Sequence, residues 1–363
     1  MKKKLAIVTI SYGNNYGNKL QNYAMQEVYK KFNLDVKTIK FNPSINKKKK
    51  LILKIKNASF TNIINKLLKT INYKNYKKNY QNRINNFNLF NKKIDYTKDY
   101  YESNYMNIDE PFDYYSVGSD QVWNPYFADF SNYYLLDFVN DGTKIAYAPS
   151  FGVSNIPNDV FEYFKKCLAQ FKSLSCRESD GGKIIKNLIN KEVPIVVDPT
   201  MLLTSEDWQS IATLPDDLKN KKYVLTYFLG RISRKNKHLI KKYCKDNNYI
   251  LINPLNIFSN SYSYGPDNFL GLISNAEAIF TDSFHASLFS IMFKKAFFVF
   301  ERDEAGKSMS SRITTLLETF GLNDRKFKGN FDLLNKANYS NVDLILKLKR
   351  EESFNYINKS LNK

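Results

Sequence analysis

The sequence predicts an α/β protein with two Rossmann-like, doubly wound domains facing a cleft, and three observations lead to this fold class. The chain of 363 residues is longer than one hydrophobic core usually serves, and 43% of its residues are hydrophobic. Short apolar runs with strand character alternate with amphipathic helical patterns in two separate blocks. Many of the expected strands end in a polar cluster, which is typical of parallel sheets that bind ligands at their carboxyl ends.

The first block opens with a strand, a loop and a helix. Residues 5–10 have strand character, 11–17 form a loop rich in Gly and Asn, and 18–32 repeat apolar side chains at helical spacing. A second strand is expected at 36–41. The alternation resumes at Tyr114, with further strands expected at 114–117, 144–148, 171–176 and 193–197.

A second block with the same alternation follows a linker at 203–217. Its expected strands are 223–229, 249–253, 277–281 and 296–300, and its expected helices are 235–246, 266–275, 284–294 and 307–320. Residues 333–363 also have a helical pattern. We therefore expect an N-terminal domain at 1–203, a C-terminal domain at 204–327, and a helical extension at 328–363 that packs back on the N-terminal domain.

A basic segment interrupts the first block. The chain carries a formal net charge of +20, and residues 36–94 hold 16 Lys or Arg and no acidic residue. We expect two or three helices within 44–94. The mixture of apolar and cationic positions at helical spacing favours docking on an anionic membrane surface. The alternative is a solvated basic pair of helices on the domain surface.

Composition and spacing disfavour several classes of protein. The apolar run after Met1 is too short for a signal-peptide core, and no stretch has the length and apolarity of a transmembrane helix. Three widely spaced cysteines predict neither a disulfide framework nor a zinc site. We therefore expect a cytoplasmic protein, peripheral at the inner face of the membrane if the basic segment docks there. A charge confined to one segment, without a recognition motif, disfavours specific nucleic-acid binding.

The most informative stretch is 277–286, where a buried strand passes directly into a helix. Asp282, Ser283 and His285 lie at this junction, and His285 is one of two histidines in the chain. The carboxyl end of a strand is the usual ligand position in open α/β sheets, and the start of a helix attracts anions. The alternative is a structural histidine at a helix start capped by Asp or Ser.

Two polar clusters in the first block are further candidates. The loop from Gly13 to Gly17 lets the backbone approach an anion, and Lys19 adds positive charge; the alternative is an ordinary tight turn. The second cluster follows the strand 114–117. In it, a carboxylate suits sugar hydroxyls or a base, and an indole suits stacking on a sugar face; its members are Ser119, Asp120, Gln121 and Trp123. The alternative is a capped helix start with a buried tryptophan.

Three arginines also follow expected strands or begin an expected helix. The planar guanidinium of Arg177 suits a carboxylate or phosphate, and the alternative is a structural ion pair with Glu178 or another acid. Arg302 and Arg312 flank 307–311, where together they would form a second anion site. For Arg302 the simpler interpretation is a solvated helix start.

Seven motifs, in order, resemble the bacterial polysaccharide pyruvyl transferase family. They lie at 13–24, 117–124, 146–152, 175–178, 197–200, 280–286 and 311–322. The resemblance implies a two-domain fold like that of GT-B glycosyltransferases, with the active site in the cleft. It also implies phosphoenolpyruvate as the donor substrate, no cofactor or metal, and a sugar of a surface polysaccharide or its lipid-linked precursor as the acceptor. The usual product is a cyclic pyruvate ketal.

The resemblance also assigns roles to individual residues. His285 matches the family's active-site histidine, and Arg177 matches an arginine expected to hold the donor. Many members have Arg two residues before the histidine, where this chain has Ser283. Either a donor contact is missing there or another cation replaces it, and Arg312 and Lys19 are the candidates. We expect Ser283, Gly13 and Gly17 to contact the donor as well. His285 would act as the acid–base group with Asp282 orienting it, and Asp120 would contact the acceptor. The alternatives are a glycosyltransferase that uses a nucleotide-sugar and a non-catalytic glycan-binding relative.

Overall fold

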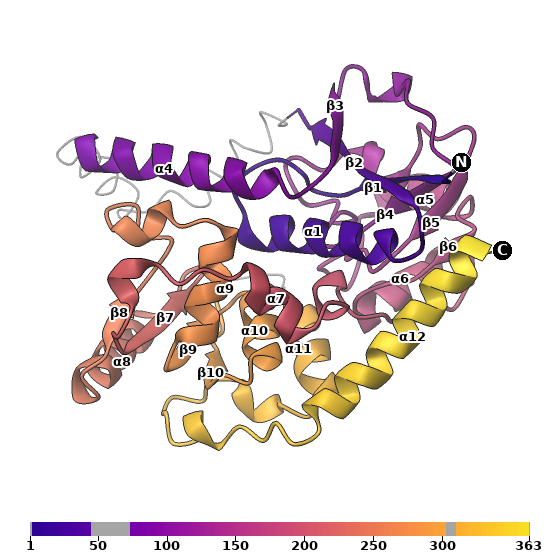
Figure 1. Ribbon diagram of the computed structural model, residues 1–363. Helices are drawn as coiled ribbons and strands as arrows, with labels where there is room; N and C mark the ends of the chain where they lie inside the picture. Colours follow the sequence, from indigo (N-terminus) through magenta and orange to yellow (C-terminus); the bar gives the residue numbers. More distant parts are fainter. Residues whose placement is uncertain (1, 45–72, 303–309, 363) are drawn as a thin grey trace. The chain divides into compact units, whose positions relative to one another are not determined.

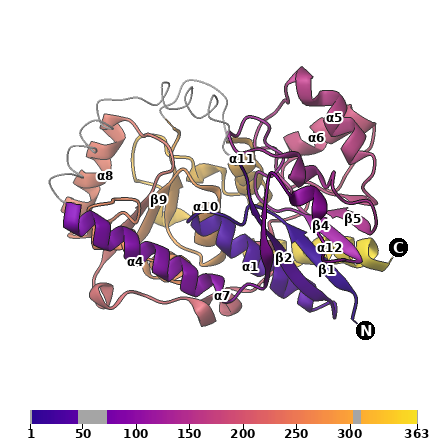
Figure 2. The same ribbon diagram turned by 90° about the horizontal axis from the view of Figure 1, so that it is seen from above.

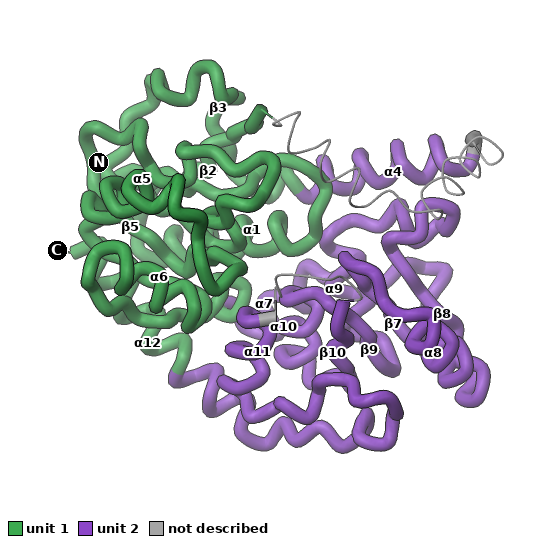
Figure 3. The backbone as a smooth tube through the Cα atoms, turned by 180° about the vertical axis from the view of Figure 1, so that it is seen from behind, with its two compact units in different colours: residues 1–73, 91–202, 349–363 green, residues 74–90, 203–348 purple. Residues whose placement is uncertain are grey.

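The computed structural model describes residues 2–44, 73–302 and 310–362, and the chain forms two compact units (Figure 3). The first unit comprises Met1–Tyr73, Asn91–Leu202 and Lys349–Lys363, and the second comprises Lys74–Phe90 and Leu203–Leu348. Two parts differ from the expected domains. Helix α4 (Tyr73–Asn91) clusters almost entirely with the second unit, and helix α12 (Val342–Asn362) passes from the second unit to the first at Lys349.

The first unit contains a six-stranded parallel sheet with the order β3-β2-β1-β4-β5-β6 (Figure 1). Strands β1, β2, β4 and β5 are also labelled in Figure 2. Its strands are β1 (Lys4–Val8), β2 (Asp35–Asn42), β3 (Tyr96–Tyr101), β4 (Tyr114–Val117), β5 (Thr143–Ala146) and β6 (Ser173–Leu174). Because β2 lies on one side of β1 and β4 on the other, the direction of winding reverses between β1 and β4. This reversal is the position at which doubly wound sheets bind ligands.

Helices cover both faces of this sheet. On one face, the hydroxyl of Tyr29 in α1 (Tyr16–Lys30) lies 2.7 Å from that of Ser116 in β4. On the other face, Val117 belongs to a core cluster that includes residues of α5 (Asn158–Leu168) and α6 (Ser179–Ile189). The first-unit half of α12 is anchored at the carboxyl end of β5, where the Tyr356 hydroxyl donates to the Ala146 carbonyl. The sheet is thus buried on both sides, as its apolar strands require.

The second unit contains a four-stranded parallel sheet with the order β10-β9-β7-β8 (Figure 1). Its strands are β7 (Tyr223–Tyr227), β8 (Ile250–Ile252), β9 (Ala278–Thr281) and β10 (Phe297–Val299). Here the winding reverses between β7 and β9. The carboxyl ends of these two strands therefore mark the ligand position of the second sheet.

Apolar helix faces bury this second sheet. Helix α8 (Arg234–Asp246) covers one face through Ile240 and Cys244, and the ring of Phe269 in α9 (Pro266–Asn275) packs on Tyr227 from the other. Helix α10 (Phe284–Met292) is wholly buried beside α9, and α7 (Ser205–Ile211) packs on it through Trp208. Helix α11 (Ser310–Thr319) contacts α10.

Helix α4 is held to the second unit by polar side chains. Asn79, Arg83 and Asn86 donate hydrogen bonds to the carbonyls of Ser259, Tyr262 and Ser263, at 3.1, 3.0 and 2.8 Å. The Arg83 guanidinium also lies 4.8 Å from the ring centre of Phe87. The rest of the expected basic helical segment, residues 45–72, lies outside the described residues.

The predicted fold class, α/β with two doubly wound parallel sheets, is confirmed. Individual elements differ. The edge strand β3 was not predicted, and the expected strand 193–197 forms only an isolated bridge between Cys176 and Ile195. Among the described residues, no helix is long and apolar enough to span a bilayer.

Candidate functional site

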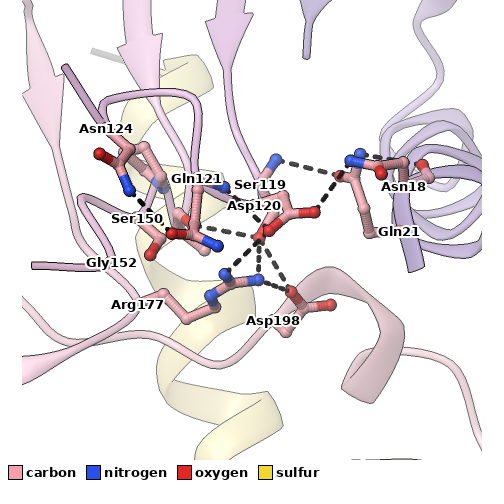
Figure 4. A network of polar contacts seen from close by, with 12 residues as sticks. Asn18, Gln21, Ser119, Asp120, Gln121, Asn124, Ser150, Gly152, Arg177 and Asp198 are labelled. Carbon is pink, nitrogen blue, oxygen red and sulfur yellow. Dashed lines mark hydrogen bonds and ion pairs between the residues drawn. The ribbon is translucent and has the colours of Figure 1, made fainter. Parts of the chain in front are cut away.

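A buried polar network lies where β1, β4, β5 and β6 of the first unit end (Figure 4). From α1, the Asn18 amide donates to Asp120 Oδ2 at 2.9 Å, and Gln21 Oε1 accepts from the Ser119 N–H at 3.1 Å. The Thr9 hydroxyl donates to the Ser119 carbonyl at 3.0 Å. The loop after β4 is therefore fixed to the β1–α1 connection, directly at the reversal point of the sheet.

Arg177 is the centre of this network, and it is neutralised within the unit. Its Nη1 lies 2.5 Å from Asp198 Oδ2 and its Nη2 lies 3.3 Å from Asp120 Oδ1, while only 2% of the side chain is exposed. Burial lowers the pKa of the guanidinium, but the charges of Asp198, Asp120 and Glu178 outweigh it, so the net pKa lies above the ordinary value. The expected donor-binding role of Arg177 is corrected accordingly, because two carboxylates already match its buried charge.

Asp120 is the acid that this network orients. It accepts from Asn18, from Arg177 and from the Gln121 N–H at 2.9 Å, and its backbone has a φ of +71°. A non-glycine residue in this region is strained by about 1 kcal/mol or more, and surrounding contacts must maintain it. Such a preorganised carboxylate suits a hydrogen-bond acceptor or a base for substrate hydroxyls.

A second turn supports Asp120 from the end of β5. Glu178 Oε1 accepts from the Ser150 hydroxyl and from the N–H groups of Phe151 and Gly152, at 2.9, 2.9 and 3.1 Å. The Ser150 N–H in turn donates to the Asp120 carbonyl at 2.8 Å. Sequence reasoning missed Glu178 and Asp198 as site residues. Their signal was the acidic residue after each of the last two expected strands of the first block.

Trp123 is a core residue, contrary to the expected acceptor role. The residue is fully buried, its indole N–H donates to the Tyr134 carbonyl at 2.9 Å, and its ring packs on Phe151 and Phe171. The indole is therefore part of the core beneath the loop, because its large apolar surface gains more from burial than from solvent exposure. Gln121 and Ser119 are also buried, and both stabilise the loop that carries Asp120.

The expected anion loop after β1 contains a turn, a helix start and a buried lysine. Gly13 has a φ of +72°, whereas Gly17 lies inside α1, which begins at Tyr16 with Asn15 as its cap. Lys19 Nζ donates to the Ser11 carbonyl at 2.6 Å, and its side chain makes no ion pair with a described residue. Burial, together with the charge of Lys40, lowers the pKa of Lys19 to about 8.

At the reversal point of the second sheet, Asp282 joins three strand ends. Its Oδ1 accepts from the Leu229 N–H and its Oδ2 from the Gly230 N–H, each at 2.7 Å, and Arg302 Nε also donates to Oδ2 at 2.7 Å. Both carboxylate oxygens thus accept hydrogen bonds that hold the loop after β7 and Arg302, which follows β10. The expected role of Asp282 in orienting His285 is corrected: its described contacts stabilise these loops instead.

His285 occupies the first turn of α10, directly after the carboxyl end of β9. It is 7% exposed, and Ser283 caps the helix by accepting from the Ala286 N–H. Ser283 is therefore a capping residue, in place of the expected donor contact. The Arg312 guanidinium lies 5.7 Å from the ring centre of Phe284, whose ring is 5.3 Å from that of His285. Phe284 thus contacts both a cation and the imidazole.

The other histidine, His238, is exposed on α8. Among the described residues, no group of three or more His, Cys, Asp or Glu side chains is arranged to hold a metal ion.

Two doubly wound units, each with polar side chains at its reversal point, place the protein in the class of two-domain α/β proteins with Rossmann-like sheets. A sequence model of the family described as "Polysaccharide pyruvyl transferase" matches residues 15–304. The chain therefore belongs to the polysaccharide pyruvyl transferase family, and this assignment makes it a transferase.

Solved structures are similar to this chain at low sequence identity. A putative UDP-N-acetylglucosamine 2-epimerase from Listeria monocytogenes has a TM-score of 0.53 and 11% identity, covering 98% of this chain and 90% of that one. The UDP-N-acetylglucosamine 2-epimerase from Rickettsia bellii has a TM-score of 0.48 and 11% identity, covering 99% of both chains. At this identity the Listeria structure supports the fold alone. No curated protein matches the sequence.

Proposed function

We propose that the protein transfers pyruvate from phosphoenolpyruvate to two hydroxyls of a sugar, forming a pyruvate ketal on a surface polysaccharide or its lipid-linked precursor. The observation that carries the proposal is His285. The family model includes it, and it lies in the first turn of α10 at the reversal point of the second sheet. Histidine donates and accepts protons near neutral pH, which both halves of ketal formation require.

The proposed reaction begins with His285 donating a proton to the methylene carbon of the donor. That carbon becomes a methyl group, and its neighbour gains oxocarbenium character. A sugar hydroxyl attacks this carbon and loses its proton to a base, and the bond to phosphate breaks. The second hydroxyl then closes the ring. Of the two hydroxyl protons, one replaces the proton that His285 gave to the new methyl group, and the other leaves with phosphate.

The donor carries about three negative charges, so its site needs cations and N–H donors. Arg312 is proposed as a donor-binding residue because its guanidinium lies 5.7 Å from the ring centre of Phe284, the residue before His285 in α10. Lys19 is proposed because it is a buried ammonium with no ion-pair partner among the described residues, an arrangement that is costly unless an anion compensates it. Arg177 is proposed to position Asp120, because its charge is already matched.

Asp120 is proposed to contact the acceptor. Three described donors hold its carboxylate, and the buried groups around it carry more negative than positive charge: Asp120, Asp198 and Glu178 surround one guanidinium. Such surroundings suit neutral sugar hydroxyls better than an anionic donor.

The proposal predicts that His285→Ala lowers turnover by roughly 10²-fold, the usual contribution of a general acid–base group, while the fold survives. Phosphate release from phosphoenolpyruvate would be followed with lipid-linked oligosaccharides, and mass spectrometry would detect the added pyruvate. His238→Ala is the matched control, because that histidine is exposed on α8. An unchanged rate in His285→Ala would refute the assignment. Stabilisation by a nucleotide-sugar, but not by phosphoenolpyruvate, would favour a glycosyltransferase instead.

We further propose that the segment 44–94 docks on an anionic membrane that presents the acceptor. Its support is the charge pattern of the sequence, and Lys77 and Lys78 are exposed on the described part, α4. Flotation with vesicles of neutral and anionic lipid at low salt tests this idea. The absence of binding to anionic vesicles would contradict it.

A further inference from the structure

Arg302 is built into the second unit differently from the solvated helix start that the sequence suggested. It follows β10, and its Nε lies 2.7 Å from Asp282 Oδ2, while its Nη2 lies 3.4 Å from the Asp282 carbonyl. Asp282 follows β9 and also accepts from the N–H groups of Leu229 and Gly230 after β7. The guanidinium therefore lies where the carboxyl ends of three neighbouring strands meet.

The loop after β7 is shaped to let this side chain pass. A Cβ added to Gly230 would lie 2.6 Å from Arg302 Cδ, 2.9 Å from Cγ and 3.0 Å from Nε. Any larger residue at this position would push the arginine away. Glycine at 230 and the carboxylate at 282 together hold the guanidinium in one orientation.

The Arg302 side chain is also partly exposed. It is 20% exposed, whereas that of Asp282 is 2% exposed. The partly exposed end of the ion pair is thus the cation, at the position where open α/β sheets bind ligands. By contrast, the Arg177 side chain in the first unit is 2% exposed.

The position of Arg302 along the chain also matters. Its Nη2 contacts the carbonyl of Asp282, the immediate neighbour of Ser283. Ser283 cannot supply positive charge, and its hydroxyl caps α10. Arg302 brings a guanidinium to the same turn from a different strand of the sheet.

We propose that Arg302 is a donor-binding residue, whose guanidinium binds an oxyanion of phosphoenolpyruvate, either its phosphate or its carboxylate. This inference rests on the proposed function, because that function supplies the ligand. Asp282 is then a positioning residue: it aims Arg302 and the loop after β7.

The test measures the affinity of the full chain for phosphoenolpyruvate by calorimetry. Arg302→Met alone would leave Asp282 buried beside a missing partner, so the informative comparison is between Asp282→Asn and the double variant Asp282→Asn/Arg302→Met. Neither of these leaves an unpaired carboxylate. We expect the double variant to bind about ten- to a hundredfold more weakly than Asp282→Asn, the scale of one hydrogen bond to a charged group.

Controls separate a binding role from a structural one. Arg302→Lys keeps the charge and should retain part of the affinity, and Arg234→Met, at an exposed position at the start of α8, should bind like the wild type. Inorganic phosphate and pyruvate serve as separate competing probes. The probe whose affinity falls in the double variant identifies the oxyanion that Arg302 holds.

The outcomes distinguish the inference from the function beneath it. If the wild-type chain does not bind phosphoenolpyruvate, the proposed function fails and this inference fails with it. If the wild type binds, and Asp282→Asn and the double variant bind equally, the donor role of Arg302 alone is overturned. In that case the arginine is only the counter-ion of Asp282.

Discussion

Replacing Asp198 by alanine should destabilise the first unit strongly. The carboxylate accepts from Arg177 Nη1 at 2.5 Å and from the Ser119 hydroxyl at 2.9 Å through Oδ2, and from the Thr200 N–H and hydroxyl through Oδ1. Its side chain is fully buried. Removing one partner of a buried ion pair costs about 3–5 kcal/mol, because the remaining charge stays uncompensated. For a unit of this size that loss lowers the melting temperature by about 10 °C.

The two tryptophans make this measurement specific to the first unit. Trp123 lies in the first unit and Trp208 in the second, so in a Trp208→Phe background the tryptophan fluorescence follows the first unit alone. Urea unfolding is then recorded for this background with and without Asp198→Ala, and the free energies of unfolding are compared.

Glu192→Ala is the matched control. Glu192 lies 2.6 Å from Lys186 Nζ, nearly the same distance as in the buried pair, but the two side chains are 81% and 54% exposed. An exposed pair contributes little to stability, because solvent and salt screen it. Equal shifts of the unfolding midpoint in Asp198→Ala and Glu192→Ala would refute the reasoning, because burial would then have no energetic consequence.

Three further outcomes follow from the site. Because the pKa of Lys19 is lowered to about 8, its ammonium loses its proton as the pH rises past that value. The affinity for phosphoenolpyruvate, measured by calorimetry, should therefore fall about tenfold per pH unit above pH 8. Lys19→Met should abolish this pH dependence. Because the Trp123 indole is part of the core, Trp123→Ala should lower the free energy of unfolding by about 3–5 kcal/mol in a urea titration. Trp123→Phe should leave the acceptor KM unchanged. Gly152→Ala would place a Cβ 2.0 Å from Gln121 Oε1 at a φ of +65°. This clash would displace the loop that carries Asp120, so steady-state kinetics should show a raised acceptor KM and an unchanged KM for phosphoenolpyruvate.

Most of the fold could be predicted from local patterns, and the exceptions have local physical causes. Strand β3 was missed because Tyr96–Tyr101 mixes tyrosines with Lys98 and Asp99. An edge strand pairs on one side only, and such polar composition is tolerated there. The expected strand 193–197 contains Pro194, which has no N–H to donate, and only a single bridge forms.

The candidate site was predicted in location but not in pairing. Polar residues after the strands 114–117 and 277–281 do lie at the reversal points of the two sheets. Yet Arg177, expected to hold the donor, forms buried ion pairs with Asp198 and Asp120. These acids lie 21 and 57 residues away in sequence, and no local pattern reports such a contact.

The amino-acid sequence by itself determined the alternation of strands and helices, the two blocks, the family and the positions of the polar clusters. These depend on periodicity and motif order, which short stretches of chain carry. Only the tertiary structure decided that Trp123 lies in the core, that Arg177 is neutralised, and that Arg302 reaches Asp282 past Gly230. Burial and charge pairing depend on distances through space between residues far apart in the chain, and the strand order of each sheet sets those distances.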